Sequence, residues 1–364
     1  MTTHARMSSL SLAFPEEIRS NDHWRERYPA LVESAAERAL ARLWKRDSVE
    51  SAFERAMAPY VEDPFKGALE RRVVGSEGSL DLAWEAARGA LSARGVGPED
   101  VDLVMVAAMR PDTHAVGDAA FLVRRGEFRC PAINFETACS SSVLGFDTAA
   151  NLVRAGRYRR ILVVATCTYS RDIEEDDSLA WFLADGAGAF LVEADAQPGY
   201  LGGAAIETSS TCGAFVHELG TLRGEPALVM SATRAAGATL HDTAQPFLES
   251  TVHAALENAQ TRLEDVDFFI FNTPTAWYAD FGASVLGVPR EKTISTYPIY
   301  TNVGPALMPA NLWHAAHSGR IRPGDTVCMY AVGSASTASS VVLRWGDCSL
   351  GPAPAAPRSE HQPR

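Results

Sequence analysis

The chain carries two copies of one sequence pattern, which restricts it to folds built from two similar halves. Residues 97–106 (GPEDVDLVMV) resemble residues 262–271 (RLEDVDFFIF), and an amphipathic helical pattern precedes each copy. The turns around Gly156 and Gly319 also match, and an apolar stretch follows each of them. Helical patterns that alternate with apolar strands predict an α/β fold, and the repetition predicts two copies of one strand-and-helix unit.

Cys139 lies in the most informative local segment. Residues 133–142 predict a short buried strand, a turn and a helix start, and the helix continues over residues 143–155. A thiol at a helix start meets unpaired amide hydrogens and the positive end of the helix dipole, which together favour thiolate. Such a thiolate is the nucleophile needed to take an acyl group from a thioester. The alternative interpretation is a small buried apolar side chain, the commoner role of a free cysteine.

The repeat connects Cys139 with a residue in the second half of the chain. The two glycine turns are separated by 163 residues (319 minus 156), and the same offset carries Cys139 onto Asn302. We therefore expect both residues to begin the equivalent central helix of their half, and the two helix starts to meet.

Five short motifs carry a resemblance to a known family. They are residues 113–116 (THAV), 136–139 (ETAC), 184–189 (ADGAGA), 301–304 (TNVG) and 331–336 (AVGSAS). From about Leu80 to Trp345 the chain resembles the thiolase superfamily, most closely the ketoacyl-ACP synthase III-like enzymes. The resemblance implies a thiolase-like five-layer α-β-α-β-α fold with halves at residues 1–195 and 196–350. It also implies a homodimer with the cysteine near the subunit contact.

The same resemblance implies a Cys-His-Asn triad, and here the sequence departs from the family. Cys139 and Asn302 match, but Asn272 stands where the family has its histidine, after the apolar residues 268–271. An asparagine amide donates a hydrogen bond to a developing oxyanion, but it is not basic. The turn of Gly333 and Ser334 matches the family turn whose backbone N–H helps to form the oxyanion hole, so we expect that donor at Ser334.

The function expected from this resemblance is acyl transfer. The donor would be an acyl-CoA or acyl carrier protein thioester, and no further cofactor and no metal would be needed. Loss of the histidine favours a small-molecule acceptor with an amine or a hydroxyl, in specialised metabolite biosynthesis. The alternatives are carbon–carbon condensation of the ketoacyl-ACP synthase III type, with or without decarboxylation, and a non-catalytic partner subunit of a related synthase.

Composition excludes several other classes. The formal net charge of −12 argues against non-specific nucleic-acid binding. No run of 18 or more apolar residues predicts a membrane span, and the N-terminus lacks a secretory signal pattern. Six widely spaced cysteines without Cys-x-x-Cys pairs predict a cytoplasmic protein without a disulfide framework or a zinc site.

Several further features have more than one interpretation. Residues 22–69 form a predicted helical insertion that either covers the substrate entrance or decorates the surface, and residues 351–364 predict a disordered tail. His241 is the least unlikely replacement for the missing base, whereas Glu136 is expected in a polar pocket or a subunit contact. Two arginine clusters either dock an acidic carrier protein or are solvated charges. They are Arg154, Arg157, Arg159 and Arg160, and Arg124, Arg125 and Arg129.

Overall fold

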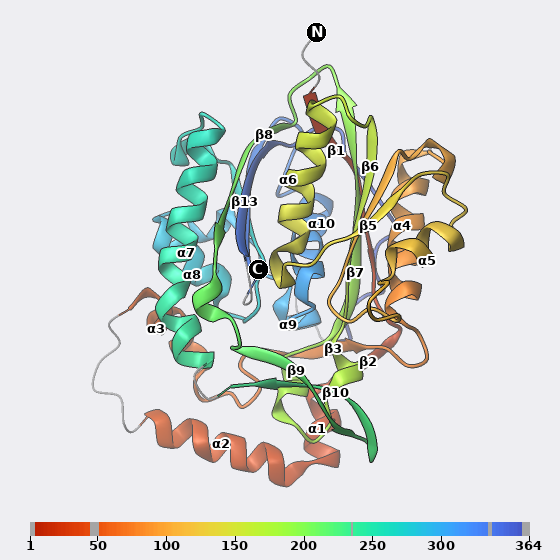
Figure 1. Ribbon diagram of the computed structural model, residues 1–364. Coiled ribbons are helices and arrows are strands. Elements are labelled where there is room, and N and C mark those ends of the chain that lie inside the picture. Colours follow the sequence, from red (N-terminus) through yellow and green to blue (C-terminus); the bar gives the residue numbers. More distant parts are fainter. Residues whose placement is uncertain (1–3, 44–50, 234–235, 334–336, 359–364) are drawn as a thin grey trace.

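Five strands of the first half and one short strand from near the C-terminus build a six-stranded mixed sheet. A computed structural model describes residues 4–43, 51–233, 236–333 and 337–358 (Figure 1). The strand order in the first sheet is β14-β1-β7-β6-β4-β5. The strands are β1 (His4–Ala13), β4 (Leu103–Ala108), β5 (Ala132–Asn134), β6 (Arg160–Thr168), β7 (Asp185–Asp195) and β14 (Ser349–Leu350). The central strands are buried on both faces, which explains their nearly continuous apolar sequences.

The second half repeats this arrangement in a four-stranded sheet of order β11-β12-β13-β8. Its strands are β8 (Tyr200–Glu207), β11 (Phe268–Phe271), β12 (Thr326–Val332) and β13 (Thr337–Arg344). In the first sheet β1 pairs antiparallel with β7, β7 antiparallel with β6, and β6 parallel with β4. The pairs β8–β13, β13–β12 and β12–β11 follow the same sequence of directions. The predicted duplication is therefore confirmed in the order and direction of the strands.

Helices form the remaining three layers (Figure 1). The central layer between the sheets consists of α6 (Ser141–Arg154) and α10 (Leu307–His317). Outside the first sheet lie α4 (Ser79–Arg94) and α5 (Ala119–Arg125), and outside the second lie α7 (Ala236–Asn258) and α8 (Tyr278–Leu286). The five-layer α-β-α-β-α fold predicted from the sequence is confirmed.

The repeated glycines end the two central helices. Gly156 follows α6 and Gly319 follows α10, with φ angles of 70° and 73°. Glycine enters this left-handed region without the steric penalty of a Cβ atom, so it is the favoured residue just past a helix end. The two turns that revealed the duplication therefore have the same structural role in both halves.

The predicted insertion contains three helices, α1 (Asn21–Arg27), α2 (Pro29–Leu43) and α3 (Ala52–Met57). The strands β2 (Glu17–Ser20) and β3 (Glu70–Val73) flank the insertion in sequence, and they pair with each other in a two-stranded antiparallel sheet. Trp24 and Phe65 of this region pack with Trp181 in one aromatic cluster. The buried Arg71 guanidinium lies 4.7 Å from the Trp24 ring and 5.4 Å from the Phe65 ring. The insertion is therefore joined to the body through packed side chains.

The tail differs from its prediction. Over residues 351–358 it lies along the body, where Arg72 donates a hydrogen bond to the Ala355 carbonyl at 2.8 Å. The Arg358 backbone N–H donates to the Glu70 carboxylate at 2.9 Å. The prediction of disorder is wrong for residues 351–358, because buried charged groups of β3 hold the tail backbone; residues 359–364 lie outside the described part of the chain.

The remaining elements are the hairpin β9 (Phe215–Leu222) and β10 (Glu225–Ala232) and the short helix α9 (Tyr297–Tyr300). Within the described residues, no helix combines the length and the apolar composition needed to cross a bilayer. All six cysteines are free thiols.

Candidate active site

Cys139 is the middle residue of the 3₁₀ turn Ala138–Ser140, which joins β5 to α6. The side chain is buried, with 8% relative exposure. Ala138, immediately before it, has a φ of +55°, a conformation that costs a non-glycine residue about 1 kcal/mol or more. Glu136 holds the turn, because its Oε1 accepts hydrogen bonds from the Ala138 N–H at 2.7 Å and from Ser141 Oγ at 2.9 Å. Glu136 itself is exposed beside the edge strand β5.

Asn302 occupies a related position in the second half. Thr301 precedes it with a φ of +54°, so the offset that links Cys139 with Asn302 also links Ala138 with Thr301. The match at the helix start is less close than predicted. Asn302 lies before its 3₁₀ turn, Gly304–Ala306, whereas Cys139 lies inside its own, because α10 has 11 residues and α6 has 14.

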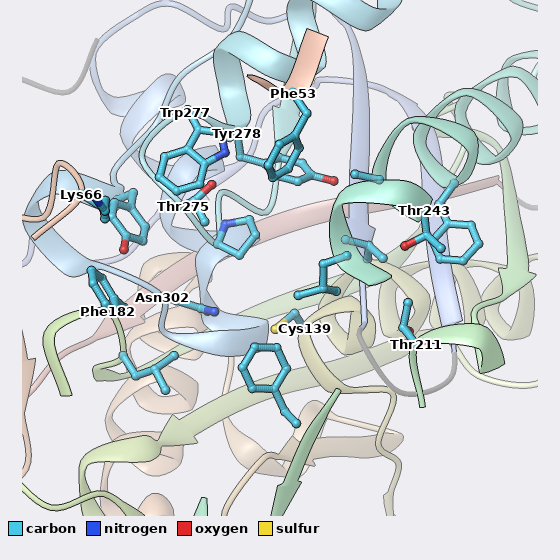
Figure 2. Close-up of a pocket in the computed structure, with 18 of the residues that line it drawn as sticks. Phe53, Lys66, Cys139, Phe182, Thr211, Thr243, Thr275, Trp277, Tyr278 and Asn302 are labelled. Carbon is cyan, nitrogen blue, oxygen red and sulfur yellow. The ribbon is translucent and has the colours of Figure 1, made fainter. Parts of the chain in front are cut away.

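The backbone of Asn302 is fixed on both sides. Its N–H donates to the Phe182 carbonyl and its own carbonyl accepts from the Ala184 N–H, both at 3.0 Å. The side-chain Oδ1 accepts from the Gly304 N–H at 2.8 Å. With the oxygen held in this way, the amide nitrogen of Asn302 points into the cavity that also contains Cys139 (Figure 2).

Cys139 and Asn302 share a cavity of about 310 Å³ between the two halves. Its wall is almost entirely apolar, and seven of its side chains are aromatic. They are Phe53, Phe182, Phe215, Phe247, Trp277, Tyr278 and Tyr297. A cavity with apolar walls and a few polar groups at one place is the usual form of a small-molecule site.

The insertion forms part of this wall. Phe53 of α3 packs edge-to-face against Trp277 and Phe281, with ring centroids 6.2 Å and 5.5 Å apart. Lys66 also lines the cavity, and its Nζ donates to the Val61 carbonyl at 2.6 Å. Of the two interpretations of residues 22–69, these contacts favour a cover over the cavity that contains Cys139.

Asn272 lies next to the cavity but is not part of its wall. The side chain is fully buried, its Oδ1 accepts from the Val332 N–H at 3.1 Å, and its Nδ2 contacts the Val332 carbonyl at 3.4 Å. The predicted hydrogen bond from Asn272 to a substrate oxyanion is therefore not supported by this geometry. Buried polar groups are nearly always paired, and the end of β12 supplies the partners.

The turn of Gly333 and Ser334 is described only in part, because Ser334 lies outside the described residues. Gly333 packs directly on the turn that contains Cys139, since a Cβ atom there would lie 2.0 Å from the Thr137 carbonyl oxygen. Only glycine, which has no Cβ atom, allows the two backbone segments to come this close. The position of the backbone N–H of Ser334 stays a prediction.

Tyr169 is a polar neighbour of Cys139 that the sequence reasoning missed. It begins the 3₁₀ turn Tyr169–Asp172 after β6, is 3% exposed, and places its hydroxyl 4.0 Å from the Cys139 sulfur. The strands β4, β5 and β6 run parallel, so their carboxyl ends lie at one edge of the sheet. Ligand sites of α/β sheets gather at that edge. The position of Tyr169 directly after β6 could therefore have indicated from the sequence that it lies near the site.

Sequence comparisons relate most of the chain to known proteins. The family described as 3-oxoacyl-(acyl-carrier-protein) synthase III matches residues 133–210, and its C-terminal domain matches residues 256–345. Beta-ketoacyl-(acyl-carrier-protein) synthase III of Rhizobium meliloti is 32% identical over 285 residues, which cover 76% of this chain and 88% of that protein. The protein of the same name from Bordetella petrii is 33% identical, covering 72% and 80%.

This chain belongs to the 3-oxoacyl-(acyl-carrier-protein) synthase III family. Solved structures agree in fold. 3-Oxoacyl-(acyl carrier protein) synthase III from Pseudomonas aeruginosa has a TM-score of 0.77 at 23% identity, covering 94% of this chain and 98% of that one. A variant of OleA from Xanthomonas campestris has a TM-score of 0.71 at 18% identity, covering 94% and 99%.

Burial opposes ionisation of the Cys139 thiol. Burial raises the pKa of Cys139 to about 11, although the contact with Tyr169 lowers it. Burial therefore opposes the thiolate form that the helix start was expected to favour. A rise of about two pKa units corresponds to roughly 3 kcal/mol, which exceeds the 0.3–1 kcal/mol typical of a helix dipole.

Among the described residues, no histidine takes the place of the family histidine in the cavity. None of the histidines in the described part of the chain lines the cavity. His241 of α7 packs against Phe53 with ring centroids 5.1 Å apart, and its Nε2 is 3.4 Å from Ser51 Oγ and its Nδ1 2.9 Å from the Asp242 carboxylate. The structure does not bring His241 to Cys139.

The arginine cluster that includes Arg154 and Arg160 lies at the far end of α6 from Cys139. A helix of this length places the two ends about 20 Å apart. Arg160 pairs with Glu193 at 2.5 Å, and Arg125 of the other cluster pairs with Asp81 at the same distance. These contacts favour surface ion pairs over carrier docking. Within the described residues, no group of three or more metal-ligating side chains is present.

Proposed function

We propose that this chain is an acyltransferase that accepts an acyl group from an acyl-CoA or acyl carrier protein thioester onto Cys139. The observation that carries the proposal is the shared cavity, in which a buried cysteine and the amide nitrogen of Asn302 face one apolar space. Family membership supports the same chemistry, because the relatives are named as acyl-carrier-protein synthases.

The first step is an exchange of thioesters. The Cys139 sulfur bonds to the acyl carbon, the bond from that carbon to the donor sulfur breaks, and the thiol proton ends on the released CoA or carrier thiol. Asn302 donates a hydrogen bond to the carbonyl oxygen as negative charge develops, and each such donor is worth on the order of 3 kcal/mol. The backbone N–H of Ser334 is proposed as a second donor. No cofactor and no metal is needed.

The acyl group is proposed to be apolar, with an unbranched or aromatic chain. Aromatic rings surround the cavity, and each methylene buried there contributes about 0.8 kcal/mol to binding. A charged or strongly polar acyl group would lose its hydration against walls that are almost entirely apolar.

The second step transfers the acyl group to the amine or hydroxyl of a small molecule. No histidine in the described residues reaches the cavity, and an amine whose own pKa is near the ambient pH needs little help from a base. Carbon–carbon condensation is the second candidate, and the names of the relatives favour it. A non-catalytic partner subunit is the third, and the open cavity above Cys139 counts against it.

A homodimer is proposed on the exposed edge of the first sheet. The edge strand β5 carries Ile133, which is 43% exposed, and Val116 in the neighbouring loop is 55% exposed. An open strand edge with exposed apolar side chains is a natural place for pairing with a second copy. A cytoplasmic location stays a prediction from the cysteine pattern.

The test is a turnover assay with purified protein. Medium-chain acyl-CoAs are supplied with either a panel of small amines and alcohols or a malonyl carrier protein, and free thiol and carbon dioxide are measured. The proposal predicts thiol release and an amide or ester product without carbon dioxide, abolished by Cys139→Ala. Carbon dioxide release that depends on Cys139 would favour condensation over acyl transfer to an amine or a hydroxyl. Equal turnover by Cys139→Ala would overturn both functions.

A further inference from the structure

The Tyr169 hydroxyl is buried against the nucleophile. Its side chain belongs to an apolar cluster with Cys167, Ile173, Leu183 and Met230. A buried tyrosine hydroxyl usually finds a hydrogen-bond partner. Among the described residues, the partner of this hydroxyl is the Cys139 sulfur, 4.0 Å away.

Gly304 makes room for this hydroxyl from the other half of the molecule. A Cβ atom at Gly304 would lie 3.3 Å from Tyr169 Oη and 3.1 Å from Cys167 Sγ. Gly304 also has a φ of +56°, a conformation that suits glycine. The hydroxyl is therefore held between the Cys139 turn and the turn that follows Asn302.

The chemistry of the two groups defines which one donates. Burial raises the pKa of Tyr169 well above its usual value, so its hydroxyl keeps its proton. A thiolate accepts hydrogen bonds and donates none, so the hydroxyl is the donor whenever Cys139 is ionised. Asn272, which stands in place of the family histidine, is engaged with the Val332 backbone.

We propose that Tyr169 is a catalytic residue whose hydroxyl donates a hydrogen bond to the Cys139 sulfur whenever acyl transfer places negative charge there. The inference rests on the proposed acylation of Cys139. During acylation the Cys139 proton passes to the departing donor thiol, and Tyr169 keeps its own proton. During transfer to an amine or a hydroxyl, the carbon–sulfur bond breaks, the acceptor proton ends on Cys139, and Tyr169 stabilises the departing sulfur again.

The test compares the pH dependence of Cys139 alkylation in wild type and Tyr169→Phe. Iodoacetamide is used as the probe, and peptide mass spectrometry follows Cys139 separately from Cys212, whose exposed thiol serves as an internal reference. Because a hydrogen bond to a charged group is among the stronger ones, we expect Tyr169→Phe to lower the alkylation rate of Cys139 at pH 8 about tenfold. The midpoint of the pH profile of Cys139 alkylation should also move to higher pH. The Cys212 rate stays unchanged.

Tyr200→Phe is the matched control. Tyr200 is also buried, and its hydroxyl donates to the Asp147 carboxylate at 2.6 Å, outside the cavity wall. Removing this hydroxyl costs a hydrogen bond of the fold but leaves the Cys139 profile unchanged. If both variants shift the profile equally, Tyr169 has only a structural role and the inference is overturned.

If Tyr169→Phe fails to fold, the fully buried Cys167 becomes alkylated as well. A second replacement then tests the inference. Replacement of Tyr169 by 3-fluorotyrosine keeps the shape and makes the hydroxyl a stronger donor, so Cys139 reacts faster at pH 8. An unchanged rate contradicts the inference.

Acylation by an acyl-CoA, measured on the same samples, separates the two proposals. No acylation of wild type defeats the proposed function, and without it Tyr169 has no catalytic role. Acylation of wild type and Tyr169→Phe at equal rates defeats only the role of Tyr169.

Discussion

Asn272 and Val332 form a reciprocal contact between the ends of two neighbouring strands. The asparagine Oδ1 accepts from the Val332 N–H at 3.1 Å, and its Nδ2 contacts the Val332 carbonyl at 3.4 Å. Val332 is followed by Gly333, which packs against the turn of Cys139. Asn272 therefore supports the backbone that packs beside Cys139.

Asn272→Ala is expected to lower the free energy of unfolding by about 2 kcal/mol, because it leaves a backbone N–H and a carbonyl of Val332 without partners in the protein interior. Urea unfolding measures the loss. Asn258→Ala is the control, since Asn258 is exposed and makes one hydrogen bond, to the Gly203 carbonyl, so its loss should be smaller. Unchanged stability combined with lost acyl transfer would instead place Asn272 in the chemistry.

Phe53→Ala is expected to widen the cavity and to shift the preference toward bulkier acyl donors. The ratio of kcat/KM for a long over a short acyl-CoA should rise about tenfold, a typical effect of a small change in pocket volume. Met57→Ala is the control, because Met57 lies on the same helix but outside the cavity wall. If both variants keep the wild-type ratio, the insertion does not select the acyl group.

Deletion of residues 353–364 is expected to lower the free energy of unfolding by about 3 kcal/mol. The deletion removes the carbonyls of Ala355 and Ala356, which accept from the buried Arg72 guanidinium, and hydrogen bonds to charged groups are the stronger class. The chain shortened by residues 359–364 alone keeps both carbonyls and is the reference. Equal stability of both shortened chains would show that the tail contacts contribute nothing.

His314 is expected to make the fold acid-sensitive. Burial lowers the pKa of His314 to about 4, and the Tyr300 hydroxyl lies 3.0 Å from its Nε2. Between pH 6.5 and pH 4 the unfolded chain binds a proton that the folded chain does not, so stability falls as the pH falls through this range. The loss should be on the order of 2 kcal/mol after allowing for partial exposure.

His314→Gln keeps a hydrogen-bond acceptor for Tyr300 without titrating, so its stability should change less over the same pH range. His317→Gln, at an exposed position on the same helix, should follow the wild type. If the free energy of unfolding falls equally with pH in wild type and His314→Gln, His314 is not the source of the acid sensitivity.

The sequence predicted the features that repeat or that depend on a few neighbouring residues. The glycine turns at Gly156 and Gly319, the position of Cys139 before a helix, and its pairing with Asn302 across the halves all belong to this class. Each follows from local backbone preference or from the duplication itself, both of which can be read along the chain.

Features that depend on burial or on distant contacts were missed or wrong. Tyr169 reaches Cys139 across 30 residues of sequence, and Phe53 reaches the cavity from the predicted insertion of residues 22–69. The pKa of Cys139 follows burial rather than the visible helix start. The tail lacks large apolar residues, so its composition predicted disorder, but its backbone carbonyls meet Arg72.

Intact-protein mass spectrometry of the purified chain, incubated with a panel of apolar acyl-CoAs, tests the central claim most directly. Wild type is expected to gain the mass of one acyl group, peptide mapping should place it on Cys139, and Cys139→Ala should gain none. No mass gain with any acyl-CoA or acyl carrier protein, or an equal gain on Cys139→Ala, would contradict the assignment of Cys139 as the nucleophile.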